Sequence, residues 1–264
     1  MDLRQTLTKN EWRLNCILNG LFRLIGRIPR PMARRIANFL GDVAFLLDRR
    51  HRDVSLKNLR LALGHELDTR QRLSLARSVF RHLAQIPFEL GWSLTVDLES
   101  LYRHITIVGL ENYQAAYQRG RGILVVTAHI GNWELLPVVA KRAGIPICIV
   151  HRPLDFKPLD RFFKDTRSRY GANLIPSRRA LLKTVKALKK GEAVAILMDQ
   201  NVDFYDGVWV DFFGHPACTT KAMAVLARKT GAAVLPVFLY RHANGFRAVF
   251  GETLPPVITG DERK

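Results

Sequence analysis

A chain of 264 residues with 48% hydrophobic content is long enough for one large α/β domain or two small ones with a sizeable core. Its formal net charge of +18 implies an anionic partner, namely nucleic acid, an acidic membrane surface, an acidic protein or a phosphorylated substrate. The three cysteines lie far apart, which excludes a disulfide framework or a CxxC pair and favours a reducing compartment. The sequence contains no signal-peptide pattern and no run of 18 uncharged apolar residues, so neither a signal peptide nor an ordinary transmembrane span is predicted.

Residues 1–100 are predicted to form a helical cap and not an independent domain. Apolar periodicity predicts four helices, over Trp12–Ile28, Met32–Leu47, a segment from Arg49 that includes Leu63, and Thr69–Trp92. Pro87 is expected to kink or shorten the last one. The apolar faces of the first two helices are wide and flanked by arginines, so these helices either lie in the interface of an anionic membrane or pack on the core. Both interpretations remain open.

Residues 101–264 are predicted to form an α/β core, because short β-branched runs alternate with amphipathic segments. Strands are expected at Ile105–Val108, Ile123–Val126, Ile145–Val150, Asn173–Ile175, Ala193–Met198, Ala233–Tyr240 and Phe246–Phe250. Helices are expected at Glu111–Gln118, Leu135–Ala143, Leu159–Tyr170, Ala180–Lys190 and Thr219–Thr230. This alternation predicts a largely parallel central sheet flanked by helices.

The candidate site begins where the Ile123–Val126 strand ends. His129 follows this strand and precedes a helix that is predicted to start near Asn132, the position at which open α/β sheets bind ligands. Glu134, in the first helical turn, is expected to reach back to the imidazole and hold it as a general base. The backbone amides of Gly131 and Asn132 are candidate donors to an oxyanion.

Each of these residues also has a structural interpretation. A lone histidine in a turn is more often structural than catalytic, and a glutamate in a first helical turn is expected from the helix dipole alone. The combination of a strand end, a histidine, a glycine and an acid at fixed spacing favours the catalytic interpretation. Arg152 also follows a predicted strand, where a guanidinium suits bidentate phosphate binding, although it is one of 41 Lys and Arg residues.

The six residues His129–Glu134, with the text HIGNWE, match the HX4D/E motif of glycerolipid-type acyltransferases. They most closely resemble the bacterial lipid A late acyltransferases, the lauroyl and myristoyl transferases. The run Asn58–Leu63 after Arg52 is similar to an N-terminal signature of that family. Asp199-Gln200, an aromatic FFGxP stretch at 212–216 and a Thr-Thr pair at 219–220, expected to open a helix, also follow in the family's order.

This resemblance covers roughly residues 12–255 and implies a membrane-associated O-acyltransferase. A fatty acyl thioester, on acyl carrier protein or on CoA, would be the co-substrate, with no bound cofactor and no metal. The acceptor would be a hydroxyl of a phosphorylated glycolipid such as a lipid A precursor, and the location the cytoplasmic face of the bacterial inner membrane. His129 and Glu134 would be catalytic, Arg152, Asp199 and Gln200 would bind substrate, and the aromatic stretch would line an acyl groove.

Family members usually continue past the last strand into a C-terminal helix, whereas this chain stops at Asp261–Lys264. The resemblance therefore predicts that the α/β core is C-terminally truncated or that the last piece is absent.

The sequence bears on three other functions. A metal centre is disfavoured because His129, Glu134, His151, Asp199 and His215 form no HExxH or HxH pattern. The charge alone would serve a nucleic-acid-binding protein equally well, but no helix-turn-helix, zinc-finger or RNP text supports one. A lysophospholipid or other glycolipid acyltransferase that uses acyl-CoA remains open. The GxSxG, GxGxxG and Walker motifs are missing.

Overall fold

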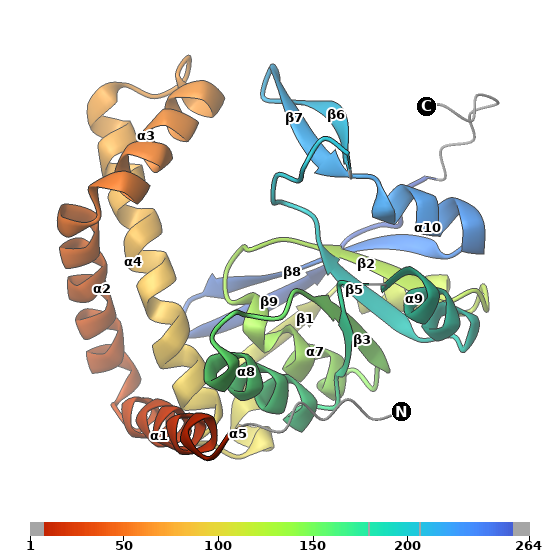
Figure 1. Ribbon diagram of the computed structural model, residues 1–264, viewed down its shortest axis with the longest axis horizontal. Helices are drawn as coiled ribbons and strands as arrows, with labels where there is room; N and C mark the ends of the chain where they lie inside the picture. The colour runs from red at the N-terminus through yellow and green to blue at the C-terminus, as the bar shows by residue number, and fades with distance from the viewer. Residues whose placement is uncertain (1–7, 179, 206, 256–264) are drawn as a thin grey trace.

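A computed structural model describes residues 8–178, 180–205 and 207–255 of the chain. Four N-terminal helices form an arch on one side of an α/β core, and a β-hairpin projects from the core at the top of the view (Figure 1). The prediction that the core is C-terminally truncated concerns the segment that ends at Asp261–Lys264, which lies outside the described residues. No helix among the described residues combines the length and apolar character needed to cross a membrane.

The arch consists of α1 (Lys9–Gly26), α2 (Arg30–Leu47), α3 (Arg49–Leu63) and α4 (Thr69–Ser93). Local capping explains three of the starts: the side chains of Thr8, Asp48 and Asp68 accept hydrogen bonds from backbone amides in the first turns of α1, α3 and α4. All four helices were predicted from apolar periodicity. The expected shortening at Pro87 is wrong, because α4 continues through this proline to Ser93.

The core contains a seven-stranded sheet with the order β1-β9-β8-β2-β5-β3-β4. Its strands are β1 (Ile105–Val108), β2 (Ile123–Thr127), β3 (Ile147–His151), β4 (Asn173–Pro176), β5 (Ala193–Leu197), β8 (Ala233–His242) and β9 (Gly245–Phe250). Only the β8–β9 pair is antiparallel. The prediction of a largely parallel sheet flanked by helices is confirmed.

Helices cover both faces of this sheet. One face packs against α6 (Leu110–Tyr117), α7 (Leu136–Arg142), α8 (Lys157–Arg169) and the end of α4. The other face packs against α9 (Ala180–Lys189) and α10 (Ala222–Thr230). Central strands with helices on both faces are buried on both sides, which explains why β2 is an almost continuous apolar run.

The arch is joined to the core through α8 and the end of α4. The ring of Phe22 on α1 stacks on that of Phe162 on α8, with centroids 4.2 Å apart. The amide nitrogen of the Asn15 side chain donates to the carbonyl oxygen of Pro158 over 2.9 Å. Gly26 and Gly91 allow α1 and α4 to cross closely, because a Cβ at Gly26 would overlap the Gly91 carbonyl.

Two elements differ from the sequence prediction. Residues 207–220, expected as a loop followed by a helix start, form a hairpin of β6 (Gly207–Phe212) and β7 (His215–Thr220). Thr219 and Thr220 therefore end a strand, and α10 begins only at Ala222. A short helix, α5 (Leu98–Arg103), was not predicted; it is capped by Asp97, whose side chain accepts a hydrogen bond from the amide of Ser100.

Candidate active site

His129 lies just beyond the carboxyl end of β2, as predicted, and its partner is Asp199. Its ring nitrogen Nδ1 is 2.8 Å from Oδ1 of Asp199, and its backbone amide donates to Oδ2 over 2.8 Å. Asp199 follows β5, which pairs with β2 in parallel. Two adjacent strand ends thus bring together residues that are 70 positions apart in the chain.

A carboxylate accepts hydrogen bonds but does not donate them, so this contact places the ring hydrogen on Nδ1 and leaves Nε2 as an acceptor. The ring also packs edge-on against Trp133, with centroids 4.7 Å apart. About a third of the His129 side chain remains exposed (32%), which leaves the imidazole accessible to a substrate.

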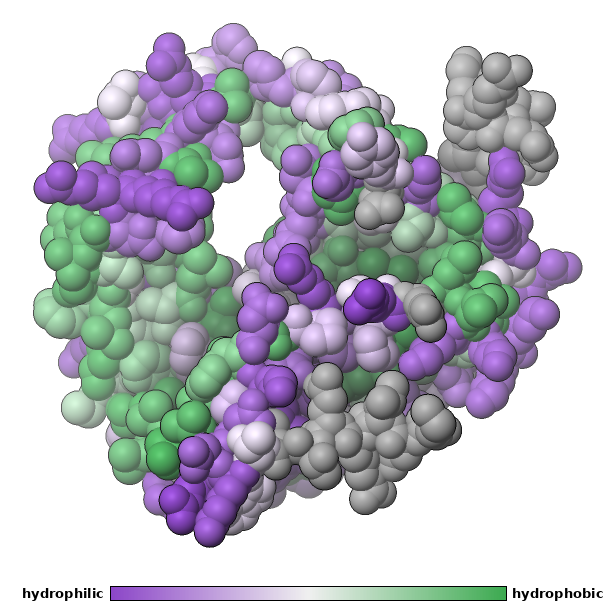
Figure 2. Space-filling view, viewed as in Figure 1, coloured by the Kyte–Doolittle hydropathy of each residue, from purple (hydrophilic) through white to green (hydrophobic). Residues whose placement is uncertain are grey.

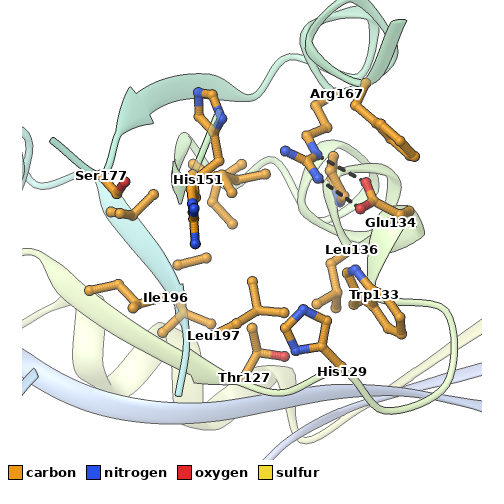
Figure 3. A pocket seen from close by; sticks show the side chains of 18 of the residues that line it. Thr127, His129, Trp133, Glu134, Leu136, His151, Arg167, Ser177, Ile196 and Leu197 are labelled. Atoms are coloured by element: carbon orange, nitrogen blue, oxygen red, sulfur yellow. Dashed lines mark hydrogen bonds and ion pairs between the residues drawn. The ribbon is translucent and has the colours of Figure 1, made fainter. Parts of the chain in front are cut away.

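Glu134 does not make the predicted contact with His129. It lies in the short 3-10 helix η1 (Trp133–Leu135), and both its oxygens accept hydrogen bonds from the guanidinium of Arg167 on α8, over 2.7 and 2.9 Å. The Glu134 side chain is only 8% exposed and that of Arg167 18%. A buried carboxylate needs a cation, and α8 supplies one on the far side from the imidazole (Figure 3).

The loop that carries His129 is held from behind by polar groups of α4 and β8. The side chain of Asn132 donates to Glu89 over 2.8 Å, and Glu89 accepts two hydrogen bonds from Arg241. His82 contacts the carbonyl oxygen of Gly131 at 3.2 Å. These contacts join the loop to α4 of the arch, and α4 in turn to strand β8 of the sheet.

The predicted amide donors Gly131 and Asn132 do not line the cavity described below. Gly131 has a φ of +65° and forms a bridge to Leu239, and a Cβ there would overlap the Leu239 carbonyl oxygen. Asn132 is completely buried. This segment therefore serves the close packing of the loop on β8.

A cavity of about 760 Å³ opens beside His129 and runs between the sheet and helices α7 and α8 (Figure 3). This volume is within the range of small-molecule sites. Most of the wall is aliphatic, contributed by Val125, Leu136, Val139, Ala140, Ile147, Ile149 and Ala195. The cavity extends to Tyr113 on α6 and Phe250 on β9. Its shape and lining suit a hydrocarbon chain.

Polar residues gather near His129. Arg152 and Gln200, both predicted to bind substrate, line the cavity and have exposed side chains. Asp199, predicted for the same role, contacts the ring and the backbone amide of His129. The aromatic stretch Phe212–Phe213 is not part of the wall, since both residues are exposed at the turn of the β6–β7 hairpin.

Burial lowers the pKa of the His151 imidazole in the cavity wall, and nearby Arg167 and Lys164 lower it further. The ring is thus held neutral at pH 7.

Within the described part of the chain, no group of three or more His, Cys, Asp and Glu side chains gathers to bind a metal ion.

Sequence reasoning missed the residues that support the site from other elements. Arg167 was one of several basic residues on its helix, and nothing local distinguished it from Arg161 or Arg169. Glu89 and Arg241 are 152 residues apart. Arg241 alone carried a sequence signal, because a charged residue on the otherwise apolar strand β8 indicates a partner of opposite charge.

A histidine oriented by a carboxylate, at the mouth of a long apolar cavity, is an arrangement suited to transferring a group that carries a hydrocarbon chain. The family model described as bacterial lipid A biosynthesis acyltransferase matches residues 4–262. The chain belongs to this family and is an acyltransferase.

Curated relatives agree with this assignment. A lipid A biosynthesis lauroyltransferase of Escherichia coli K12 is 28% identical over 86% of this chain and 73% of its own length. A palmitoleoyltransferase of the same organism is 29% identical over 86% of this chain and 74% of its own. A phosphatidylinositol mannoside acyltransferase of Mycobacterium tuberculosis H37Rv is 29% identical over 58% of this chain and 50% of its own.

Proposed function

We propose that this protein is a membrane-associated O-acyltransferase that moves a fatty acyl chain from an acyl thioester, carried by acyl carrier protein, to a hydroxyl of a phosphorylated glycolipid such as a lipid A precursor. The observation that carries the proposal is the His129–Asp199 pair at the mouth of the apolar cavity. The cavity takes the acyl chain, and its mouth holds the thioester beside the imidazole.

In this mechanism, Nε2 of His129 removes the proton from the acceptor hydroxyl, and the oxygen attacks the thioester carbonyl carbon. The tetrahedral intermediate collapses with cleavage of the C–S bond, and the thiolate leaves with the proton from the imidazolium. Asp199 keeps the required tautomer and stabilises the ring while it is charged. No acyl-enzyme forms, and Glu134 acts only by holding Arg167 in the cavity wall.

The basic charge supports the proposed partners. With Lys+Arg 41 against Asp+Glu 23, the surface attracts an acidic carrier protein, anionic headgroups and substrate phosphates. Arg152, exposed at the cavity mouth, suits a phosphate of the acceptor lipid.

Exposed apolar residues support a place at the cytoplasmic face of the bacterial inner membrane. On the arch these residues include Trp12, Ile17, Leu24, Phe39 and Leu47. Figure 2 shows apolar surface along the arch, beside the hollow that separates it from the core. Aromatic side chains of the hairpin, such as Trp209 (64% exposed) and Phe212 (63%), are suited to a headgroup region.

The identity of the acceptor has a second candidate. The mycobacterial relative is a phosphatidylinositol mannoside acyltransferase, so a phosphorylated mannolipid is an alternative glycolipid with the same hydroxyl chemistry. A lysophospholipid with acyl-CoA as donor is a further alternative for the same site.

Transfer of a radiolabelled acyl chain from acyl carrier protein to a lipid A precursor in detergent tests the proposal. Wild type is expected to be active, and His129→Ala to lose at least about 10²-fold in rate because the general base is gone. His65→Ala, which changes an exposed histidine of the arch, is the matched control and should retain full activity.

Equal activity of His129→Ala and wild type would overturn the proposed base. Wild-type activity only with acyl-CoA, or only with a mannolipid or lysophospholipid, would overturn the proposed donor or acceptor. No transfer with any pair, together with salt-dependent binding to DNA, would favour a nucleic-acid role.

A further inference from the structure

Two polar side-chain atoms in the cavity wall have no partner. Four buried side-chain atoms among the described residues lack a hydrogen bond: Thr127 Oγ1, Asn132 Oδ1, His151 Nε2 and Thr184 Oγ1. Only Thr127 and His151 of these line the cavity. A buried polar atom without a partner is costly, so two such atoms on residues that line one cavity indicate that a ligand supplies the missing partners.

Strand register places both groups in one row. Thr127 on β2 pairs with Leu197 on β5, and His151 on β3 is two residues beyond Ile149, which pairs with Ala195. Thr127 and His151 therefore flank Leu197, roughly 10 Å apart at the usual strand spacing. One step earlier on the same face, the row consists of the apolar residues Val125, Ala195 and Ile149, so within this part of the sheet the polar side chains stand only at the strand ends.

Thr127 is the member of this row next to the proposed base. It precedes His129 by two residues, and its carbonyl oxygen accepts a hydrogen bond from the amide of Met198 over 3.0 Å. Met198 is followed by Asp199, which holds the His129 ring. The same strand pair thus fixes the hydroxyl and the imidazole, whose side chains face the same end of the cavity (Figure 3).

We propose that the Thr127 hydroxyl donates a hydrogen bond to the carbonyl oxygen of the acyl thioester; this inference rests on the acyl transfer proposed above. When the acceptor oxygen adds to the carbonyl carbon, negative charge develops on the carbonyl oxygen and strengthens this bond. The hydroxyl keeps its proton throughout, and the bond weakens again when the C–S bond breaks. Thr127 thereby supplies the oxyanion contact that Gly131 and Asn132, outside the cavity wall, do not provide.

The test compares Thr127→Val, Thr127→Ser and Thr184→Val. Valine keeps the shape of threonine and removes the hydroxyl, so Thr127→Val is expected to lower kcat by about 10²-fold, as loss of one oxyanion donor does. Thr127→Ser should remain within a few-fold of wild type. Thr184→Val removes an equally buried, unpartnered hydroxyl from α9, away from the cavity, and should leave kcat unchanged.

Three readouts separate this role from a structural one. The melting temperature of Thr127→Val should not fall, because the hydroxyl makes no hydrogen bond in the free protein. The change should appear in kcat more than in KM, and the shape of the pH–rate profile should remain that of wild type. Unchanged kcat in Thr127→Val, or an equal loss in Thr127→Ser, would overturn the inference.

Ligand binding keeps this test separate from failure of the proposed function. Two non-hydrolysable donor analogues are compared by calorimetry, a dodecyl pantetheine ketone that keeps the carbonyl and a dodecyl pantetheine thioether that lacks it. Wild type should prefer the ketone, and Thr127→Val should bind the two equally. Suppose that wild type catalyses no transfer and still binds the ketone more tightly than the thioether, while Thr127→Val binds the two equally. In that case the proposed reaction is wrong and the carbonyl contact stands. Equal binding of both analogues to wild type would overturn the contact.

Discussion

Two carboxylates near the site have different partners, and this sets their roles. Asp199 contacts the imidazole of His129, whereas Glu134 makes a bidentate pair with Arg167 in the cavity wall. In the proposed mechanism, Asp199 therefore acts on the reacting proton, and Glu134 on the shape and stability of the wall.

Glu134→Gln should destabilise the protein by about 3 kcal/mol, because the largely enclosed guanidinium of Arg167 loses its counter-ion. The double variant Glu134→Gln/Arg167→Met should recover much of this loss, as measured by urea unfolding. Asp165→Asn, which breaks the exposed Arg161–Asp165 pair, is the control and should cost no more than about 1 kcal/mol.

Asp199→Asn gives the opposite pattern, a fall in kcat with little change in stability, because its side chain is 36% exposed and its task is to orient the imidazole. If Glu134→Gln instead lowered kcat strongly without any loss of stability, Glu134 would be the orienting carboxylate and the pairing in the structure would not be the catalytic one.

At the scale of elements, the β6–β7 hairpin is the largest departure from the sequence prediction. It exposes apolar side chains on both of its faces, because Trp209 and Phe212 are three residues apart on β6, so they lie on opposite faces, and both are exposed. A two-stranded hairpin without a sheet to pack on leaves this apolar area without a partner inside the described protein. Its proposed partner is the membrane interface.

A hairpin variant with Trp209, Phe212 and Phe213 changed to Ser should bind anionic phosphatidylglycerol vesicles at least about tenfold more weakly than wild type, because each aromatic side chain contributes on the order of 1.5 kcal/mol when buried. Vesicle co-sedimentation measures the change. Asp211→Ser, on the same hairpin, should not weaken binding. Undiminished binding of the triple variant would leave the membrane contact to the arch alone.

At the scale of the whole molecule, the buried His151 and the half-buried His82 link stability to pH. Burial lowers the pKa of His82, which faces Arg241 and Glu89, and that of His151, which faces Arg167, Lys164 and Asp160. The unfolded chain takes up protons near the ordinary histidine pKa of about 6.5, whereas the folded chain does so only at lower pH. Their stabilisation is complete above pH 6.5 and is lost as pH falls below it.

The melting temperature should therefore decline as pH is lowered from about 7.5 to 5.5, above the range in which carboxylates titrate. In the double variant His82→Gln/His151→Gln this decline should be shallower, because glutamine does not titrate. A slope equal to that of wild type would show that other groups control stability in this interval.

The sequence by itself determined most of the elements, the largely parallel sheet, the family resemblance and the position of His129 at a strand end. These depend on patterns within a few residues, such as the apolar period of a helix, a β-branched run or a capping side chain, and local chemistry fixes them. The match of the family model confirmed the resemblance.

Only the tertiary structure decided which side chains meet. The carboxylate that contacts His129 belongs to Asp199, which lies 70 positions away at the end of a neighbouring strand. Glu134, only five positions away, forms its hydrogen bonds with Arg167 on α8. The cavity forms because α7 and α8 leave a space over β2, β3 and β5, and strand order puts Thr127 and His151 in one row of its wall. Strand order and helix docking are set by the packing of the whole chain, and no local pattern encodes them.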